Sequence, residues 1–189
     1  MANFTTLAQY KILKNINSTN KDAEINMLIP FATEYIKRYL KRTIIDFYGS
    51  PTKTEYFDSN LDTVYLKEFP IVGSPNVAFS QDGGVTYTVI VENTDYFINA
   101  ETGYLFTGTT GTGFKTATNP HNSLRVIYNG GESTTPDEIE LACILLVAYW
   151  LEEQYVDNKV VNTNVISTFP PEKLPHHIRS ILEANRELL

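Results

Sequence analysis

The sequence contains one cysteine, one tryptophan and two methionines among its 189 residues. A single cysteine excludes an intramolecular disulfide, and Cys143 lies in the most apolar segment, which favours packing over reactivity. No apolar run is long enough to cross a bilayer, because Glu152 and Glu153 end that segment. The N-terminal residues also contain no apolar signal segment. We therefore expect a globular protein that has no membrane partner and folds without disulfide or metal.

Basic residues are also scarce. The chain has 22 acidic and 15 basic residues, which gives a formal net charge of −7. A protein of this charge is a poor general nucleic-acid binder, because such binding depends on neutralising phosphates. The composition favours proteins as its partners.

Residues 135–155 form the most informative segment. Thr135, Pro136 and Glu138 have the spacing of a capped helix start, with proline in the first helical position and a carboxylate three residues after the cap. The segment that follows is apolar on nearly all sides, and a helix of this kind must be buried on all sides. We therefore expect neighbouring subunits to cover part of it. One stripe contains Ile139, Ala142, Cys143, Leu146 and Trp150, and a second contains Leu141, Leu145, Ala148 and Leu151.

Helical periodicity also appears at both ends of the chain. Residues 6–14 and 22–42 have apolar side chains at intervals of three and four, with Pro30 predicted to kink the second helix rather than break it. A polar linker over residues 158–171 leads to Pro175, which opens a final helix.

Between residues 52 and 128 the pattern changes to short runs rich in Val, Ile, Tyr, Phe and Thr, separated by turn residues, which predicts antiparallel β-strands. The predicted strands cover residues 53–57, 63–66, 76–80, 85–91, 95–99, 103–106 and 124–128. The Gly/Thr-rich residues 108–122 are too many for a tight hairpin turn and predict a mobile loop. The fold class is therefore α+β: a helical core with an inserted antiparallel β subdomain. The predicted divisions are residues 1–43 (N-terminal helices), 44–131 (β subdomain), 132–157 (long buried helix) and 158–189 (linker and C-terminal helix).

Motifs that would indicate catalysis, metal binding or a cofactor fail on inspection. Phe114 separates Gly113 from Lys115, so residues 108–116 do not match a phosphate-binding loop. Asp58, Asn60 and Asp62 have the spacing of the first ligands in a calcium-binding loop, but the segment lacks the glycine and the final glutamate of such a loop. His121, His176 and His177 lack metal-ligand spacing, although pairing His176 with Glu172 or Glu183 stays open. We expect no metal, no cofactor and no enzymatic activity.

One basic cluster remains, consisting of Lys37, Arg38, Lys41 and Arg42. Its simplest interpretation is that cations near a helix C-terminus interact favourably with the helix dipole. The alternative is that the cluster faces DNA inside an assembly. The basic residues of each subunit would then contact the DNA without binding it tightly.

The order of these elements resembles the head-tail connector (adaptor, or head-completion) proteins of tailed bacteriophages. The resemblance is carried by Tyr39-Leu40-Lys41, Pro70-Ile71, Tyr96, Glu101-Thr102-Gly103 and Pro136 to Ile139, in fixed order over most of the chain. The chain departs from the family at Tyr128-Asn129-Gly130-Gly131, where an aromatic-glycine turn is common, and at Phe114, where a tryptophan is common.

The resemblance implies a structural virion protein, assembled in the host cytoplasm and located at the head-tail interface. It implies a homo-oligomeric ring, twelve subunits by expectation, that binds beneath the portal protein, extends the DNA channel and offers a platform to the next neck or tail protein. Two other classes stay open: a tail-terminator or stopper-type neck protein, and an enzyme with an unrecognised active site.

The resemblance also implies a role for the C-terminal segment, which is expected to be the arm that binds the portal. The apolar stripe of this segment needs a surface to pack against, which the portal would supply. The alternative is that the segment folds back onto the helices of its own subunit. The residues assigned to this arm are Leu174, His176, His177, Ile178, Ile181, Leu182 and Leu188.

Overall fold

The computed structural model describes residues 2–59, 61–107, 117–160 and 174–186, with the side chains of residues 107 and 153–160 left out. The chain divides into two compact units. One comprises Met1–Lys41 and Thr135–Leu188 and is helical; the other comprises Arg42–Thr134 and is built from strands. This arrangement confirms the predicted α+β class.

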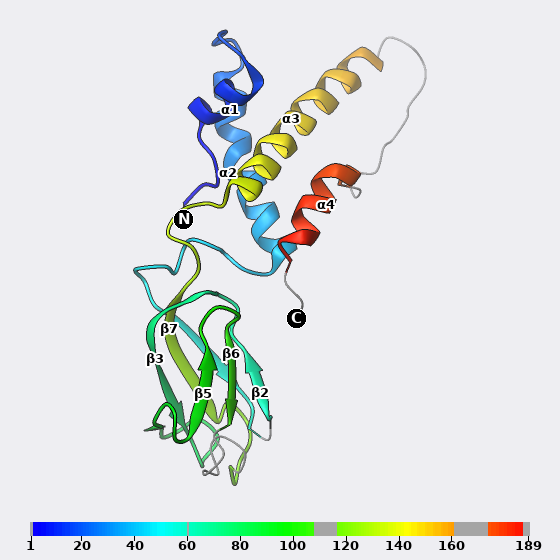
Figure 1. Ribbon diagram of the computed structural model, residues 1–189. Coiled ribbons are helices and arrows are strands. Elements are labelled where there is room, and N and C mark those ends of the chain that lie inside the picture. Colours follow the sequence, from blue (N-terminus) through cyan, green and yellow to red (C-terminus); the bar gives the residue numbers. More distant parts are fainter. Residues whose placement is uncertain (1, 60, 108–116, 161–173, 187–189) are drawn as a thin grey trace. The chain divides into compact units, whose positions relative to one another are not determined.

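The described part of the helical unit contains four helices: α1 (Leu7–Lys14), α2 (Asp22–Leu40), α3 (Asp137–Val160) and α4 (His176–Ala184). A capping box starts α1, in which the Thr6 hydroxyl accepts from the Gln9 amide at 3.3 Å and the Gln9 side chain accepts from the Thr6 amide at 2.9 Å. Helix α2 continues through Pro30, which is exposed. Figure 1 shows α3 between α2 and α4, both of which contact it.

Helix α3 begins one residue later than predicted. The Pro136 carbonyl accepts from the amides of Ile139 and Glu140 at 3.0 and 2.9 Å, so Pro136 precedes the first helical residue, Asp137. Differences of one residue at a helix end are common, because the terminal turn lacks the full set of hydrogen bonds.

The buried surface of α3 is supplied largely by its own unit. Ile139, Ala142 and Leu146 are at most 1% exposed, and the second stripe is covered too at Ala148 and Leu151. Leu141 remains 38% exposed, and Trp150 is half-buried, with its ring edge-to-face against Tyr35 at a centroid distance of 6.0 Å. The apolar circumference of α3 therefore does not by itself require a neighbouring subunit, contrary to our inference from the sequence.

Cys143 lies inside this core, where its thiol is 3.9 Å from the Thr33 hydroxyl. Burial raises the pKa of Cys143 to about 12. At neutral pH the thiol is protonated, so it packs as a small apolar group rather than acting as a nucleophile.

Two antiparallel sheets form the other unit. The four-stranded sheet has the order β1 (Lys53–Phe57), β7 (Leu124–Gly130), β3 (Ile71–Phe79), β4 (Thr88–Val89). The three-stranded sheet has the order β2 (Thr63–Tyr65), β6 (Tyr104–Thr107), β5 (Tyr96–Asn99), and lies in front of β3 and β7 in Figure 1. Their inner faces share one apolar core, as in a β-sandwich. This core contains Val64, Leu66, Ile71, Val77, Phe79, Tyr96, Leu105, Leu124, Val126 and Tyr128.

Two strands differ most from their predicted extents. β3 starts at Ile71 rather than at Asn76, because its pairing with β7 continues across an irregularity between Val72 and Asn76. β4 pairs with β3 only at Thr88 and Val89, although the apolar run predicts a longer strand. Bulges of this kind are not visible in an alternation pattern, since they change pairing and not composition.

Leu146→Ala should lower the free energy of unfolding by about 2–5 kcal/mol, because it removes buried methyl groups from the interior of the helical unit. Leu141→Ala, the same substitution at the exposed position of the same helix, should change it by less than about 1 kcal/mol. Urea unfolding followed by circular dichroism measures both. Equal effects for the two variants would contradict the burial described for α3.

Candidate functional site

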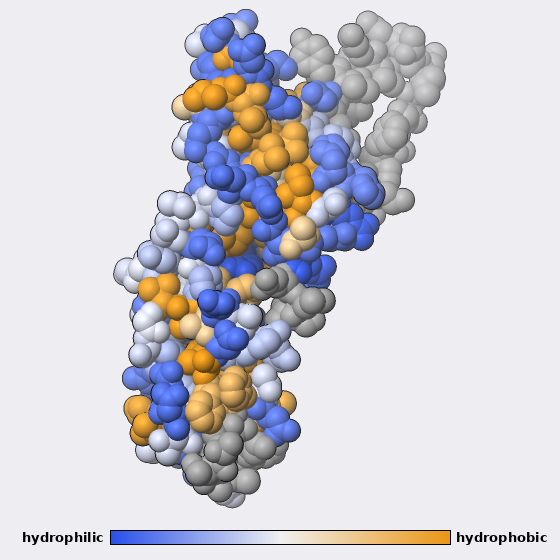
Figure 2. All heavy atoms as spheres, viewed as in Figure 1, coloured by the Kyte–Doolittle hydropathy of each residue, from blue (hydrophilic) through white to orange (hydrophobic). Residues whose placement is uncertain are grey.

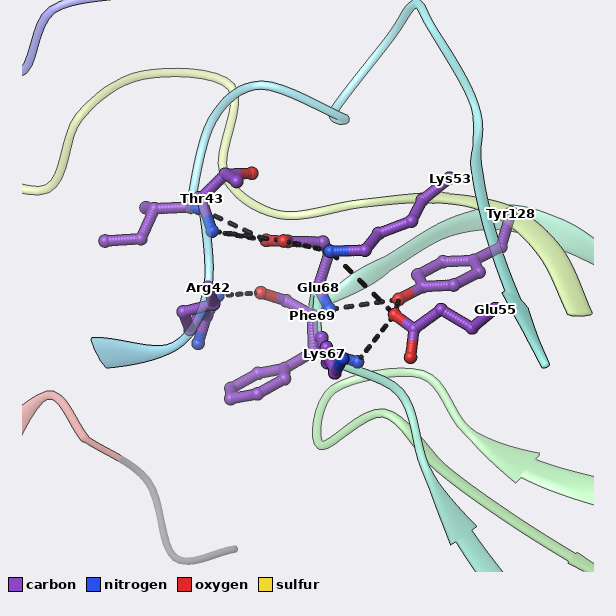
Figure 3. A network of polar contacts seen from close by, with 9 residues as sticks. Arg42, Thr43, Lys53, Glu55, Lys67, Glu68, Phe69 and Tyr128 are labelled. Atoms are coloured by element: carbon purple, nitrogen blue, oxygen red, sulfur yellow. Dashed lines mark hydrogen bonds and ion pairs between the residues drawn. The ribbon is translucent and has the colours of Figure 1, made fainter. Parts of the chain in front are cut away.

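A buried carboxylate organises the end of the β unit where the chain enters it. Glu68 is fully buried, and its oxygens accept from the amides of Thr43 at 3.0 and 3.1 Å and of Ile44 at 3.2 Å. The Lys53 ammonium lies 2.7 Å from the same carboxylate. A buried charge is costly unless it is paired and hydrogen-bonded, and both conditions hold here. Figure 3 shows these contacts converging on Glu68.

A second carboxylate extends this network. Tyr128 donates its hydroxyl hydrogen to Glu55 at 2.6 Å and accepts from the Glu68 amide at 3.1 Å. The Lys67 amide also donates to Glu55, at 3.2 Å. Burial, with the adjacent Glu55, raises the pKa of Tyr128 far above its ordinary value, so its hydroxyl stays a hydrogen-bond donor.

Two glycines let the outgoing chain pass close to this network. A Cβ at Gly130 would lie 2.3 Å from the Glu68 carbonyl oxygen, and one at Gly131 would lie 2.0 Å from the Ile44 carbonyl oxygen. Gly131 also has a φ of +102°, which favours glycine. The Glu132 amide donates to the Ile44 carbonyl at 2.7 Å. The incoming and outgoing segments of the β unit are therefore hydrogen-bonded to each other beside Glu68.

The predicted basic cluster does not form one surface. Lys37 is 6% exposed and lies 3.6 Å from Glu34, 3.4 Å from the Ala2 carbonyl and 5.5 Å from the centre of the Phe4 ring. Arg42 donates to the Phe69 carbonyl and stacks on the Phe69 ring at 3.7 Å. Arg38 and Lys41, in contrast, are exposed at the end of α2. Two of the four cations are therefore used within the fold, and two remain on the surface.

The apolar stripe of the C-terminal helix is covered by its own unit. Ile178 and Leu182 are completely buried, Ile181 is half-buried, and α4 contacts both α2 and α3. Asn185 donates to Glu138 at 2.7 Å, and the Tyr39 hydroxyl donates to Glu183 at 3.3 Å. This is the fold-back arrangement left open from the sequence.

Other residues of the predicted arm are on the surface or outside the described part. His176 and His177 are exposed, and Leu174 is half-buried. Leu188 and residues 161–173 lie outside the described residues, as do residues 108–116 of the Gly/Thr-rich loop, whereas residues 158–160, predicted as linker, continue helix α3.

A cavity of about 730 Å³ lies in the helical unit, beside the loop between α1 and α2. Burial and the charge of Glu152 raise the pKa of Tyr10, so this phenol is neutral at ordinary pH and supplies no base. Apolar side chains and three charged ones, those of Lys14, Lys21 and Glu152, line the cavity together. It is lined by Tyr10, Lys14, Ile16, Ser18, Asn20, Lys21, Ile25, Ala148, Leu151 and Glu152.

Within the described ranges, no group of three or more His, Cys, Asp or Glu residues could hold a metal ion. Asp58 of the calcium-like sequence instead accepts from the Asn122 amide at 2.9 Å and lies 3.4 Å from His121. Likewise, none of the described helices is long and apolar enough to cross a membrane.

These features define a structural protein with a helical unit, a β-sandwich unit and a buried polar network in the latter. The profile of the head completion protein family matches residues 3–188, and the chain belongs to this family. Membership of this family makes it a structural, non-enzymatic protein. The resemblance inferred from the sequence is thereby confirmed.

Solved structures with a similar fold come from a gene transfer agent (GTA) particle. One, described as the neck of the empty GTA particle computed with C6 symmetry, has a TM-score of 0.59 and 13% identity and covers 98% of this chain and 91% of its own. Another, the neck of the native particle computed with C12 symmetry, has a TM-score of 0.57 and 11% identity, and the match covers 100% of this chain and 95% of that chain. A chain of the native GTA virion has a TM-score of 0.58 and 11% identity, and the match covers 96% of this chain and 88% of that chain. A search of curated proteins finds no match.

Glu68→Ala should lower the free energy of unfolding by about 3–5 kcal/mol, because it leaves the Lys53 charge and two amides without their acceptor. Glu68→Gln keeps one acceptor oxygen and should cost less. Glu101→Ala, which removes an exposed carboxylate from the same unit, should stay within about 0.5 kcal/mol of the parent. Urea unfolding measures all three, and a Glu68→Ala protein as stable as Glu101→Ala would show that the network does not hold the unit together.

Proposed function

We propose that this protein is the adaptor that binds directly beneath the portal, forms a ring of twelve subunits and extends the DNA channel. The observation that carries the proposal is the similarity to neck chains over both units, since 98% of this chain is covered at a TM-score of 0.59. One of these necks is described with C12 symmetry. A ring of this kind acts by binding and geometry, and presents its other face to the next neck or tail protein.

The portal contact is assigned to the exposed side of α4. His176 and His177 are exposed at the start of this helix, while Ile178 and Leu182 hold it to the unit. The helix therefore offers a surface whose position does not depend on the partner. A rigid surface binds with a smaller loss of conformational entropy than a disordered arm would.

The purified protein should bind isolated portal in a pull-down, and the double variant His176→Ala/His177→Ala should weaken this binding. Its buried anchors are intact, so the variant should unfold like the parent. Asn26→Ala, an exposed change on α2, serves as the control. A protein that binds portal only when another neck protein is already in place would instead be a stopper-type component, and one that binds no neck protein would contradict the proposal.

Arg38 and Lys41 are assigned to the wall of the DNA channel. They are the exposed cations of the original cluster, and exposed cations can neutralise phosphates without specific contacts. This assignment no longer includes Lys37 and Arg42, whose charged groups contact Glu34 and Phe69 within the fold.

Arg38→Glu/Lys41→Glu should leave the protein folded, with a loss of about 0.3–1 kcal/mol per charge from the helix dipole, and should reduce the DNA retained by particles. Lys14→Glu/Lys67→Glu changes the net charge equally and provides the control. Quantifying DNA per purified particle tests the assignment. Normal DNA content in the first variant would remove the channel role and leave only the helix-dipole interpretation.

A further inference from the structure

The outer face of the three-stranded sheet carries four aromatic side chains. Tyr65 of β2 packs edge-to-face against Tyr104 of β6, with ring centres 4.6 Å apart. Phe97 of β5 stacks on Phe106 of β6 at 5.8 Å. Both are cross-strand neighbour pairs in the sheet register. We call this set, Tyr65, Phe97, Tyr104 and Phe106, the aromatic face.

The aromatic face lies on the side opposite to the sandwich core. In these strands Val64, Leu66, Leu105 and Tyr96 point into the core, so their neighbours in the alternation point outward. Tyr65 and Phe106 are 45% and 40% exposed. Figure 2 shows light orange atoms over the region where Figure 1 draws β5 and β6. Strands that are apolar on both faces need a cover on each side.

No charged side chain occupies an outward position on the described part of these three strands, where the remaining outward residues are Thr63 and Asn99. The acidic residues described in the unit stand instead in its connections, for example Asp58, Asp82 and Glu101, except Glu55 of β1, which is buried. Aromatic residues without charges at the centre are typical of protein interfaces.

The opposite side of the same sandwich, the outer face of the four-stranded sheet, has a different chemistry. Arg125 of β7 lies over the Tyr87 ring at 4.3 Å, and Tyr87 lies 6.3 Å from Tyr56 of β1. Tyr56 and Val89 are 53% and 61% exposed. We call Tyr56, Tyr87, Val89 and Arg125 the arginine face. Its one charge is positive, and an arginine over an aromatic ring is an attractive pair.

We propose that the aromatic face of one subunit packs against the arginine face of the next, and that this is the lateral contact of the ring. The ring itself rests on the proposed function. A ring that closes by rotation needs two different, complementary surfaces on each subunit, and a sandwich presents its two outer faces on opposite sides. Arg125 then meets the rings of the neighbouring aromatic face.

The charge of the chain indicates that the occupant is a second copy. Each subunit carries a formal charge of −7, so two copies repel unless they meet where carboxylates are absent. On the described strands, the outward positions of the aromatic face carry no charge and those of the arginine face carry only that of Arg125, while Asp82, in the β3–β4 connection, is close enough to Tyr87 to act on it electrostatically. Pairing two aromatic faces with each other would leave both arginine faces uncovered, and would produce a closed dimer instead of a ring.

Sedimentation velocity of the purified full-length protein, up to about 1 mM, tests the contact. The parent should form species larger than dimers. Phe106→Glu on the aromatic face and Val89→Glu on the arginine face should each lower the association constant at least about tenfold. An equimolar mixture of the two should form heterodimers and nothing larger, because each variant keeps one intact face. Tyr48→Glu, at a position 41% exposed outside both faces, should assemble like the parent.

A parent that stays monomeric, or that stops at dimers, would overturn this contact. So would a Val89→Glu protein that assembles like the parent, since the aromatic face would then bind something else. Circular dichroism identifies a variant that fails to fold, and Tyr65→Glu then replaces Phe106→Glu. Portal binding is measured separately: a monomeric parent that binds portal would retain the proposed function and lose only this contact.

Discussion

The buried carboxylate of Glu68 is the interaction on which the β unit depends. It accepts from the amides of Thr43 and Ile44 where the chain enters the unit, and it pairs with Lys53 on β1. The backbone of the same residue binds Tyr128 of the last strand and closely approaches Gly130. One residue thereby ties the first and last segments of the sandwich together. A buried charge with so many partners is intolerant of substitution, because each partner becomes an unpaired buried group when it is lost.

Tying both ends at one place also determines which surfaces remain for binding. The incoming and outgoing segments occupy the same end of the sandwich, where the Glu132 amide donates to the Ile44 carbonyl. The incoming segment contacts β7 at Asn129, whose side chain donates to the Phe47 and Gly49 carbonyls, while Tyr56 and Val89 of the arginine face and Tyr65 and Phe106 of the aromatic face remain exposed. These exposed positions are the ones that the proposed contact between copies uses.

The sequence predicted the fold class and the strand positions well where periodicity determines structure. The strand over Lys53–Phe57 was predicted with its observed bounds, because it ends in strand-favouring aromatic residues and is flanked by Pro51 and by Asp58. Glu68 was missed, although it continues the inward phase of Val64 and Leu66 and so occupies a position where an apolar residue is expected. The aromatic face had a signal too, since Tyr65, Tyr104 and Phe106 are apolar in the outward phase. The sequence could not show which cations of the basic cluster stay on the surface, because the partners of Lys37 and Arg42 depend on tertiary contacts.

Charge and burial act on this protein in opposite directions, and the proposed ring depends on their separation in space. A net charge of −7 repels copies of the chain from one another, which favours the separate subunit. Within the β unit, the described carboxylates stand in connections such as those of Asp82 and Glu101, or are enclosed like Glu55 and Glu68. The outward positions on the described strands of both sheets consequently carry no carboxylate. Repulsion therefore opposes random collisions, while an encounter that aligns two sandwiches face to face brings together aromatic, aliphatic, arginine and uncharged polar side chains.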